Sequence, residues 1–123
     1  MTNQKPIQVI VSSNFNAQAR KLKKRYRSFQ SDLKTLTDEL EAGNFLGDQI
    51  SGTTAIVYKV RLKNSDIKKG KSGGYRVIYQ QRNDVCILLV TLYSKSDESN
   101  ITAKEIQTII DHFDQADRPE DTI

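Results

Sequence analysis

Residues 55–62, AIVYKVRL, and residues 74–80, GYRVIYQ, carry the pattern that decides the fold. In both segments successive side chains alternate between two faces, as is typical of β-strands. Residues 85–93, VCILLVTLY, are almost wholly apolar, as expected for a strand that is covered on both faces. Three successive strands with short links favour an antiparallel meander, in which the first two strands pair as a hairpin.

The segments on either side of these strands add helices. Residues 7–12 are short and rich in β-branched side chains, and they predict one more strand. Two amphipathic helices follow: the first is capped by Asn14 and runs to Tyr26, and the second runs from Ser28 to a stop at Gly43. Residues 44–54 predict a loop. Thr102 and Glu105 form a capping box for a last helix, whose apolar stripe is Ile106, Ile109, Ile110 and Phe113.

The predicted order is therefore β-α-α-β-β-β-α, an α+β fold. A small, mostly antiparallel sheet would pack against an N-terminal helical hairpin and a C-terminal helix. The chain has 123 residues, about one domain's worth, so we expect a single domain over residues 1–113. Residues 114–123 are acidic and predict a disordered tail.

Composition argues against several classes of protein. One cysteine and one histidine cannot fill a zinc site, so we expect no metal ion and no cofactor. No apolar run reaches the roughly 18 residues of a transmembrane helix. Residues 1–6 are polar and lack a secretory signal, so we expect a cytoplasmic protein with no membrane partner.

Charge is unevenly distributed along the chain. The formal net charge is +4, yet residues 1–27 hold seven cations and no acid, and residues 51–82 hold eight cations and one acid. Acidic segments separate the two basic blocks. This asymmetry indicates a polyanionic partner, although two solvated cationic faces would give the same pattern.

The second basic block holds the candidate site. Lys59 and Arg61 are two apart on one predicted strand, so they share a face. If the next strand pairs with it, Arg76 joins them there. Such a cluster favours a phosphate, because Arg offers a planar fork of donors and Lys a point charge; exposure of this face to water is the alternative. The connection between the strands adds four candidate RNA-binding cations: Lys63, Lys68, Lys69 and Lys71.

Three segments together resemble a known family. Residues 58–61 (YKVR), 71–79 (KSGGYRVIY) and 92–96 (LYSKS) are similar to the RelE/HigB-type toxins of bacterial type II toxin–antitoxin pairs. The resemblance extends over residues 7–113 and includes the predicted order of elements. It implies a ribonuclease that enters the ribosomal A site and cuts mRNA there, and a cognate antitoxin that holds it inactive.

The resemblance also implies roles for individual residues. Arg76 would stabilise the transition state, and Lys59 and Arg61 would bind substrate phosphates. Tyr93 would be a proton shuttle and Lys95 a phosphate ligand. RelE itself has an arginine after this lysine and a tyrosine in the following segment, where this chain has Ser96 and residues 99–102 without a tyrosine. Either Tyr93 or Lys59 is then the general base, or activity is weak.

Two other functions remain open at this point. One is a RelE-fold module that binds RNA or a partner without cleaving it. The other is a ParE-like inhibitor of a DNA topoisomerase, against which the basic strand residues argue. The antitoxin is expected to place an acidic or amphipathic segment along the basic surface of residues 15–27 or in the groove itself.

Overall fold

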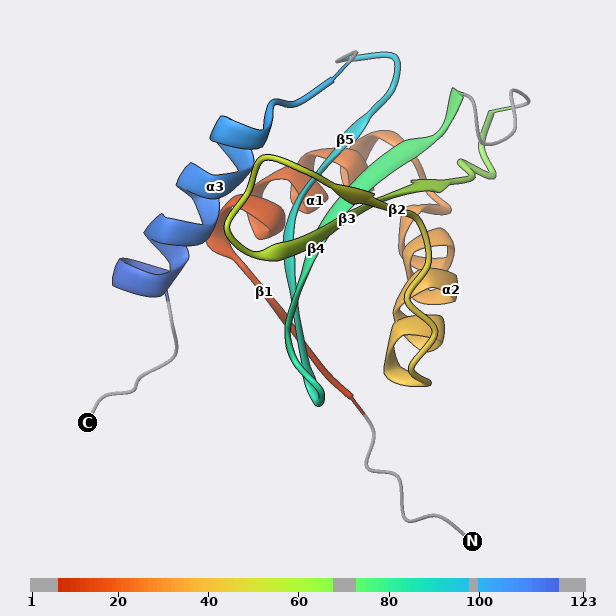
Figure 1. Ribbon diagram of the computed structural model, residues 1–123. Helices are drawn as coiled ribbons and strands as arrows, with labels where there is room; N and C mark the ends of the chain where they lie inside the picture. The colour runs from red at the N-terminus through yellow and green to blue at the C-terminus, as the bar shows by residue number, and fades with distance from the viewer. Residues whose placement is uncertain (1–6, 68–72, 98–99, 118–123) are drawn as a thin grey trace, which may run out of the picture.

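The computed structural model describes residues 7–67, 73–97 and 100–117 (Figure 1). Its elements, in chain order, are β1 (Gln8–Val11), α1 (Ser13–Arg25), α2 (Phe29–Glu41), β2 (Asp48–Ile50), β3 (Ile56–Leu62), β4 (Tyr75–Asn83), β5 (Cys86–Ser94), α3 (Ala103–His112) and the π-helical turn η2 (Phe113–Asp117). The predicted α+β fold is confirmed, because a helical pair precedes a mostly antiparallel sheet and a helix follows it.

The five strands form one sheet in the order β1-β5-β4-β3-β2. β3, β4 and β5 pair antiparallel in succession, which confirms the predicted meander. β1 pairs in parallel with β5 at one edge of the sheet. The alternation of residues 55–62 and 74–80 therefore sets which side chains share a face.

The prediction of an unbroken loop over residues 44–54 is wrong, because β2 forms within it. β2 pairs antiparallel with β3, with Asp48 opposite Lys59 and Ile50 opposite Val57. Gly47 precedes β2 with a φ of +99°, and a Cβ there would overlap the carbonyl oxygen of Lys59. Only glycine lets the chain turn so close to β3. This strand covers the edge of β3 as far as Lys59 and not beyond it.

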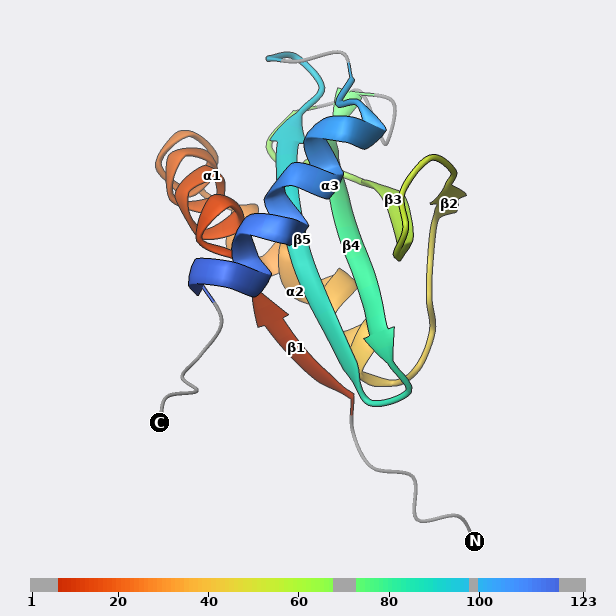
Figure 2. The ribbon, with the colours of Figure 1, turned by 60° about the vertical axis from the view of Figure 1, so that its left-hand side comes forward.

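Helices cover both faces of the sheet. Figure 2 shows α3 across one face, which we call the α3 face, with α1 and α2 behind the other, which we call the hairpin face. The α3 face buries Ile106 and Ile110 of the helix against apolar residues of the strands: Val57, Ile78, Leu88 and Val90. The hairpin face packs Phe15, Leu22, Phe29, Leu36 and Leu40 against Tyr75, Val77 and Tyr79.

The first helix is capped by Ser12, not by Asn14 as predicted. Ser12 Oγ accepts a hydrogen bond from the Phe15 N–H at 2.9 Å and donates one to the Val90 carbonyl at 2.7 Å. The serine therefore ties the start of α1 to β5. Asn14 Oδ1 instead accepts a hydrogen bond from the Thr91 hydroxyl.

The capping box of the last helix is confirmed, with Thr102 and Glu105 bonded to each other through both backbone N–H groups. Helical structure continues through η2 to Asp117, past the predicted start of the tail. Arg82 of β4 pairs with Asp114 and stacks over Phe113 at 5.3 Å, which holds this end on the sheet. The rest of the predicted tail, residues 118–123, lies outside the described residues. Among the described helices, none has the length and apolar character needed to cross a membrane.

Candidate active site

Three strands bring two arginines and a tyrosine into one row across the sheet. Arg61 of β3 is the register partner of Arg76 of β4, and Arg76 is the register partner of Tyr93 of β5. Residues directly opposite each other in antiparallel strands point to the same face. This is the α3 face, because Ile78, two residues from Arg76, packs under α3. Lys59, two residues from Arg61, lies on the same face, as the predicted hairpin requires.

Arg76 is the buried member of this row. Its side chain is 6% exposed, and its Nη1 donates a hydrogen bond to the Tyr75 carbonyl at 3.3 Å. Burial lowers the pKa of the Arg76 guanidinium from its ordinary value, and the charge of Arg61 lowers it further. Both effects arise because a cation is held away from water and beside another cation. An anion placed between the two arginines would raise the pKa of Arg76 again, because a nearby opposite charge favours the charged guanidinium.

Lys59 is half-buried and has a partner from outside the sheet. Its Nζ donates a hydrogen bond to Asn100 Oδ1 at 3.2 Å. Asn100 lies between β5 and α3 and was not among the predicted site residues. No local pattern marks it, because the contact joins segments 41 residues apart.

Tyr93 connects the row to the first helix. Its side chain is 6% exposed. It lines a hollow of about 330 Å³ together with Lys21 and Arg25 of α1 and with Asp97. Arg25 forms an ion pair with Asp97 at 2.5 Å, which raises the pKa of the Arg25 guanidinium. The basic side of α1 and the row on the sheet thus meet at Tyr93.

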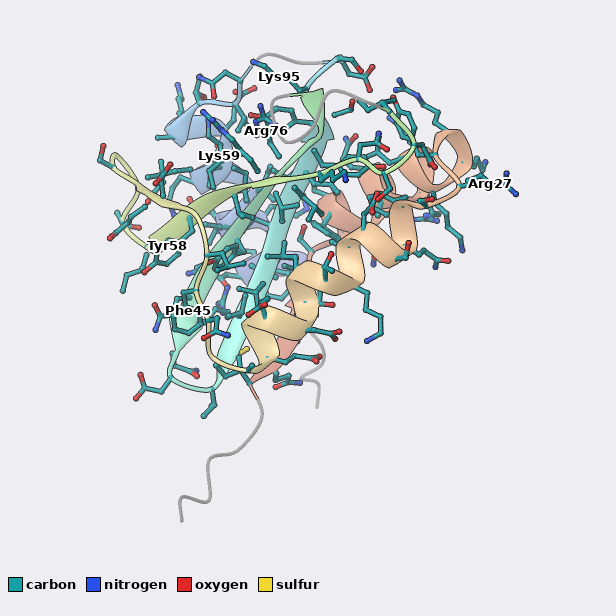
Figure 3. The ribbon with its side chains drawn as sticks, turned by 90° about the vertical axis from the view of Figure 1, so that its right-hand side faces the viewer. Arg27, Phe45, Tyr58, Lys59, Arg76 and Lys95 are labelled. Carbon is teal, nitrogen blue, oxygen red and sulfur yellow. The ribbon has the colours of Figure 1, made fainter. Side chains whose placement is uncertain are left out.

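Lys95 follows β5 at the same end of the sheet. Its backbone N–H donates to the Gly74 carbonyl at 2.9 Å, and its side chain is exposed. A Cβ on Gly74 would overlap the Leu62 carbonyl oxygen, so glycine is required where β3 and β4 converge. Figure 3 shows Lys59, Arg76 and Lys95 gathered at one end of the molecule, with Arg27, Phe45 and Tyr58 further away.

Lys63 lies in a different place from the row. It is exposed and lines a cavity of about 750 Å³ between α2 and the edge of β3, together with Lys59 and Arg61. Arg76 does not line this cavity. Lys59, Arg61 and Arg76 thus share a face of the sheet, but only Lys59 and Arg61 reach the edge cavity. Three further predicted RNA-binding residues, Lys68, Lys69 and Lys71, lie outside the described residues.

The row and Lys59 beside it therefore place two guanidinium groups, an ammonium and a buried tyrosine on one face of the sheet. Such donors suit the oxygens of a phosphate, because charge-assisted hydrogen bonds to anions are the strong ones. Among the described residues, no group of three or more His, Cys, Asp and Glu side chains is placed to hold a metal ion.

The chain matches a known protein family. Residues 11–116 match the family described as the RelE toxin of the RelE/RelB toxin–antitoxin system. The match spans α1, the whole meander and α3, and it therefore includes every residue of the row. No curated protein matches the chain significantly.

Proposed function

The chain belongs to the RelE family of toxin–antitoxin toxins, and on that premise we propose that it is an endoribonuclease that cuts mRNA in the ribosomal A site. The family match supports the toxin of a toxin–antitoxin pair. The row of cations supports the ribonuclease activity, whereas the ribosome and the mRNA follow from the resemblance to RelE/HigB-type toxins. Ribosomes would make the cytoplasm its place of action.

One observation carries the proposal: Arg61, Arg76 and Tyr93 form a row on the face that also holds Lys59. Cleavage of RNA places extra negative charge on the phosphate oxygens in the transition state. Fixed cations in a site with little water stabilise that charge most effectively. Arg76 fits this role because its guanidinium is almost wholly buried. Lys59 and Arg61 would bind the phosphate from the side that is open to solvent, and Lys95 would hold a neighbouring phosphate.

The reaction needs a base, an acid and cations, and the site offers the cations together with Tyr93 and Lys59 as groups that can transfer a proton. The 2′-oxygen of the RNA attacks the adjacent phosphorus, and the bond from phosphorus to the 5′-oxygen breaks. The 2′-hydroxyl proton passes to a base, Tyr93 or Lys59, and an acid protonates the leaving 5′-oxygen. The products are a 2′,3′-cyclic phosphate and a free 5′-hydroxyl.

The basic surface around the row would guide the RNA and its antitoxin. On one side of the row lies Lys63, in a cavity that Asp32, Glu39 and Asp48 also line. On the other side lie Lys21 and Arg25, in a hollow that Asp97 also lines. Lys68, Lys69 and Lys71 would add to the RNA-binding surface. We expect the antitoxin to cover these cations with an acidic or amphipathic segment along residues 15–27 or in the groove itself. If the protein stays a lone monomer when it is mixed with the product of its neighbouring gene, this part of the proposal fails.

The test is induction of the parent protein and of Arg76→Ala in growing cells. We expect the parent to stop growth and primer extension to find new mRNA ends within codons. Arg76→Ala should lower cleavage by about 10²–10³-fold, the loss typical of a group that stabilises transition-state charge. Circular dichroism and thermal unfolding check that the variant is folded.

Other results would support other functions. An Arg76→Ala protein as toxic as the parent contradicts the mechanism. RNA binding that weakens with salt but leaves no cut product favours the non-cleaving module. Relief of toxicity by overproduction of a topoisomerase, with intact mRNA, favours the ParE-like inhibitor.

A further inference from the structure

Asn100 and Lys59 are neighbours although they are far apart in the sequence. Lys59 Nζ donates a hydrogen bond to Asn100 Oδ1 at 3.2 Å. Lys59 belongs to β3, whereas Asn100 belongs to the connection that leads from β5 to α3. The contact therefore joins the candidate active site to the start of the C-terminal helix.

The helix itself does not need the Asn100 side chain. The N-cap of α3 is Thr102, whose hydroxyl accepts a hydrogen bond from the Glu105 N–H. The Glu105 side chain in turn accepts one from the Thr102 N–H. Asn100 precedes this capping box and is exposed. Helix capping thus gives no reason for an amide side chain at this position.

Packing of α3 fixes where Asn100 lies. Ile106 and Ile110 are 0% and 2% exposed and hold the helix on the sheet. Ile101, the residue after Asn100, packs against the same apolar cluster. The backbone of Asn100 is therefore tied to the α3 face next to the row of Arg61, Arg76 and Tyr93.

An amide oxygen is a suitable acceptor for a lysine that must bind a phosphate. It accepts one N–H of the ammonium and leaves the remaining donors and the full positive charge available. A carboxylate at the same place would neutralise that charge. A lysine with no acceptor would keep the rotamer freedom of its long side chain and lose it only on binding RNA.

We propose that Asn100 is a positioning residue of the active site: it holds the Lys59 ammonium on the α3 face, where it meets the RNA phosphate. The inference rests on the proposed function, and it adds a residue that neither the basic cluster nor the family match assigns. Asn100 acts through Lys59 and does not itself react.

The first test is a double-mutant cycle with single-turnover cleavage of mRNA on ribosomes. Asn100→Ala should lower the cleavage rate by about 10–100-fold, the size of effect that a small misplacement of a catalytic group can produce. In a Lys59→Ala background the same change should cost less than about twofold, because residues in one contact are not additive. Losses of equal size in the two backgrounds would overturn the proposal.

The second test does not depend on activity. NMR relaxation of the side-chain ammonium groups reports how far the motion of each lysine side chain is restricted. The Lys59 ammonium should be more restrained than that of exposed Lys63 in the parent, and it should lose this restraint in Asn100→Ala. A Lys59 ammonium that is equally mobile in the parent and the variant overturns the inference, whatever the cleavage assays give.

A variant with a negative charge at position 100 tests whether the contact with Lys59 affects RNA binding. Asn100→Asp keeps the shape of the side chain but places a carboxylate on Lys59. Binding of a short single-stranded oligoribonucleotide should weaken. The slope of log affinity against log salt concentration should become shallower by the contribution of about one phosphate contact. Asn83→Asp is the matched control, because its oxygen still accepts from the Val85 N–H in the distant β4–β5 turn. Equal effects of the two variants on RNA binding would contradict a specific role for Asn100.

These outcomes also separate this inference from the proposed function. A parent protein that cleaves no mRNA contradicts the proposed function and, with it, the contribution of Asn100 to cleavage. The relaxation measurement still decides whether Asn100 holds Lys59. A parent that cleaves mRNA and an Asn100→Ala variant that cleaves equally fast leave the proposed function intact and overturn the inference.

Discussion

Arg61 and Arg76 lie directly opposite each other on β3 and β4, with both side chains on the α3 face. Like charges in this cross-strand relationship repel each other, and the charge of Arg61 contributes to the lowered pKa of the Arg76 guanidinium. A folded protein keeps such a pair at a cost in stability. A bound phosphate would turn the repulsion into two attractions, which is why this pair is the best marker of the site.

Replacement of Arg61 should weaken RNA binding without removing Arg76 from its place. Arg61 is exposed, so Arg61→Gln creates no cavity. The plot of log affinity against log salt concentration for a single-stranded RNA should become shallower by about 0.7, the contribution of one phosphate contact. Fluorescence anisotropy over a range of salt concentrations measures it. Lys34→Gln removes a charge of the same sign from α2, where Lys34 pairs with Asp38, and should leave the slope unchanged.

Cys86 should react slowly with alkylating reagents. The residue begins β5, and burial raises the pKa of its thiol, an effect that the charge of Arg82 partly offsets. Only the thiolate reacts, so a raised pKa leaves less of it at any pH near neutrality. Iodoacetamide at pH 8 should modify the native chain about tenfold or more slowly than the chain in urea. Equal rates in the two states would mean that the β4–β5 hairpin opens near its turn.

The meander and the shared face of Lys59, Arg61 and Arg76 could be predicted because strands have a side-chain period of two. Alternation in residues 55–62 and 74–80 fixes which side chains lie together once the strands pair. The C-terminal helix could be predicted from the capping box of Thr102 and Glu105, since that signal is local. Each of these features follows from a pattern within one segment and from the pairing of consecutive strands.

The missed features depend on contacts between distant segments. β2 has three residues and no alternating pattern of its own, and it forms because Gly47 lets the chain approach Lys59. Ser12 caps α1 while its hydroxyl also reaches β5, which sequence spacing does not reveal. Asn100 contacts Lys59 only because α3 packs on the sheet and brings the two residues together. Tertiary packing decided all three.

The capping box should make stability depend on pH through Glu105. Hydrogen bonds from the Thr102 N–H, and then from its hydroxyl, lower the pKa of the Glu105 carboxyl below its ordinary 4.5. A carboxyl with a lowered pKa in the folded state stabilises the fold above its ordinary pKa, and this contribution is lost as pH falls through the lowered value. Glu105→Gln keeps an acceptor but cannot titrate. Thermal unfolding from pH 7 to pH 3 should therefore show the parent's advantage over Glu105→Gln shrinking below about pH 4.5; a constant difference would contradict it.

Removal of the hydroxyl from two tyrosines on β4 should change the free energy of unfolding in opposite directions. Tyr75 and Tyr79 are both fully buried on the hairpin face, and burial raises the pKa of both hydroxyls. The Tyr79 hydroxyl donates a hydrogen bond to the Leu46 carbonyl at 2.5 Å. Within the described part of the chain, the Tyr75 hydroxyl is buried without a hydrogen-bond partner. The same substitution therefore removes a satisfied group at one position and an unsatisfied group at the other.

Tyr79→Phe should lower the free energy of unfolding by about 1 kcal/mol, because the Leu46 carbonyl loses its donor. Tyr75→Phe should raise it by about 1 kcal/mol, because a buried hydroxyl without a partner costs free energy that a hydrogen atom does not. The ring stays in place in both variants, so the edge-to-face contact of Tyr75 with Phe29, at 5.3 Å, is retained. Urea unfolding at equilibrium measures both changes. If Tyr75→Phe destabilises the protein as much as Tyr79→Phe does, the Tyr75 hydroxyl has a partner in solution, and the region beneath α2 is more polar than the packing of Phe29 and Tyr75 indicates.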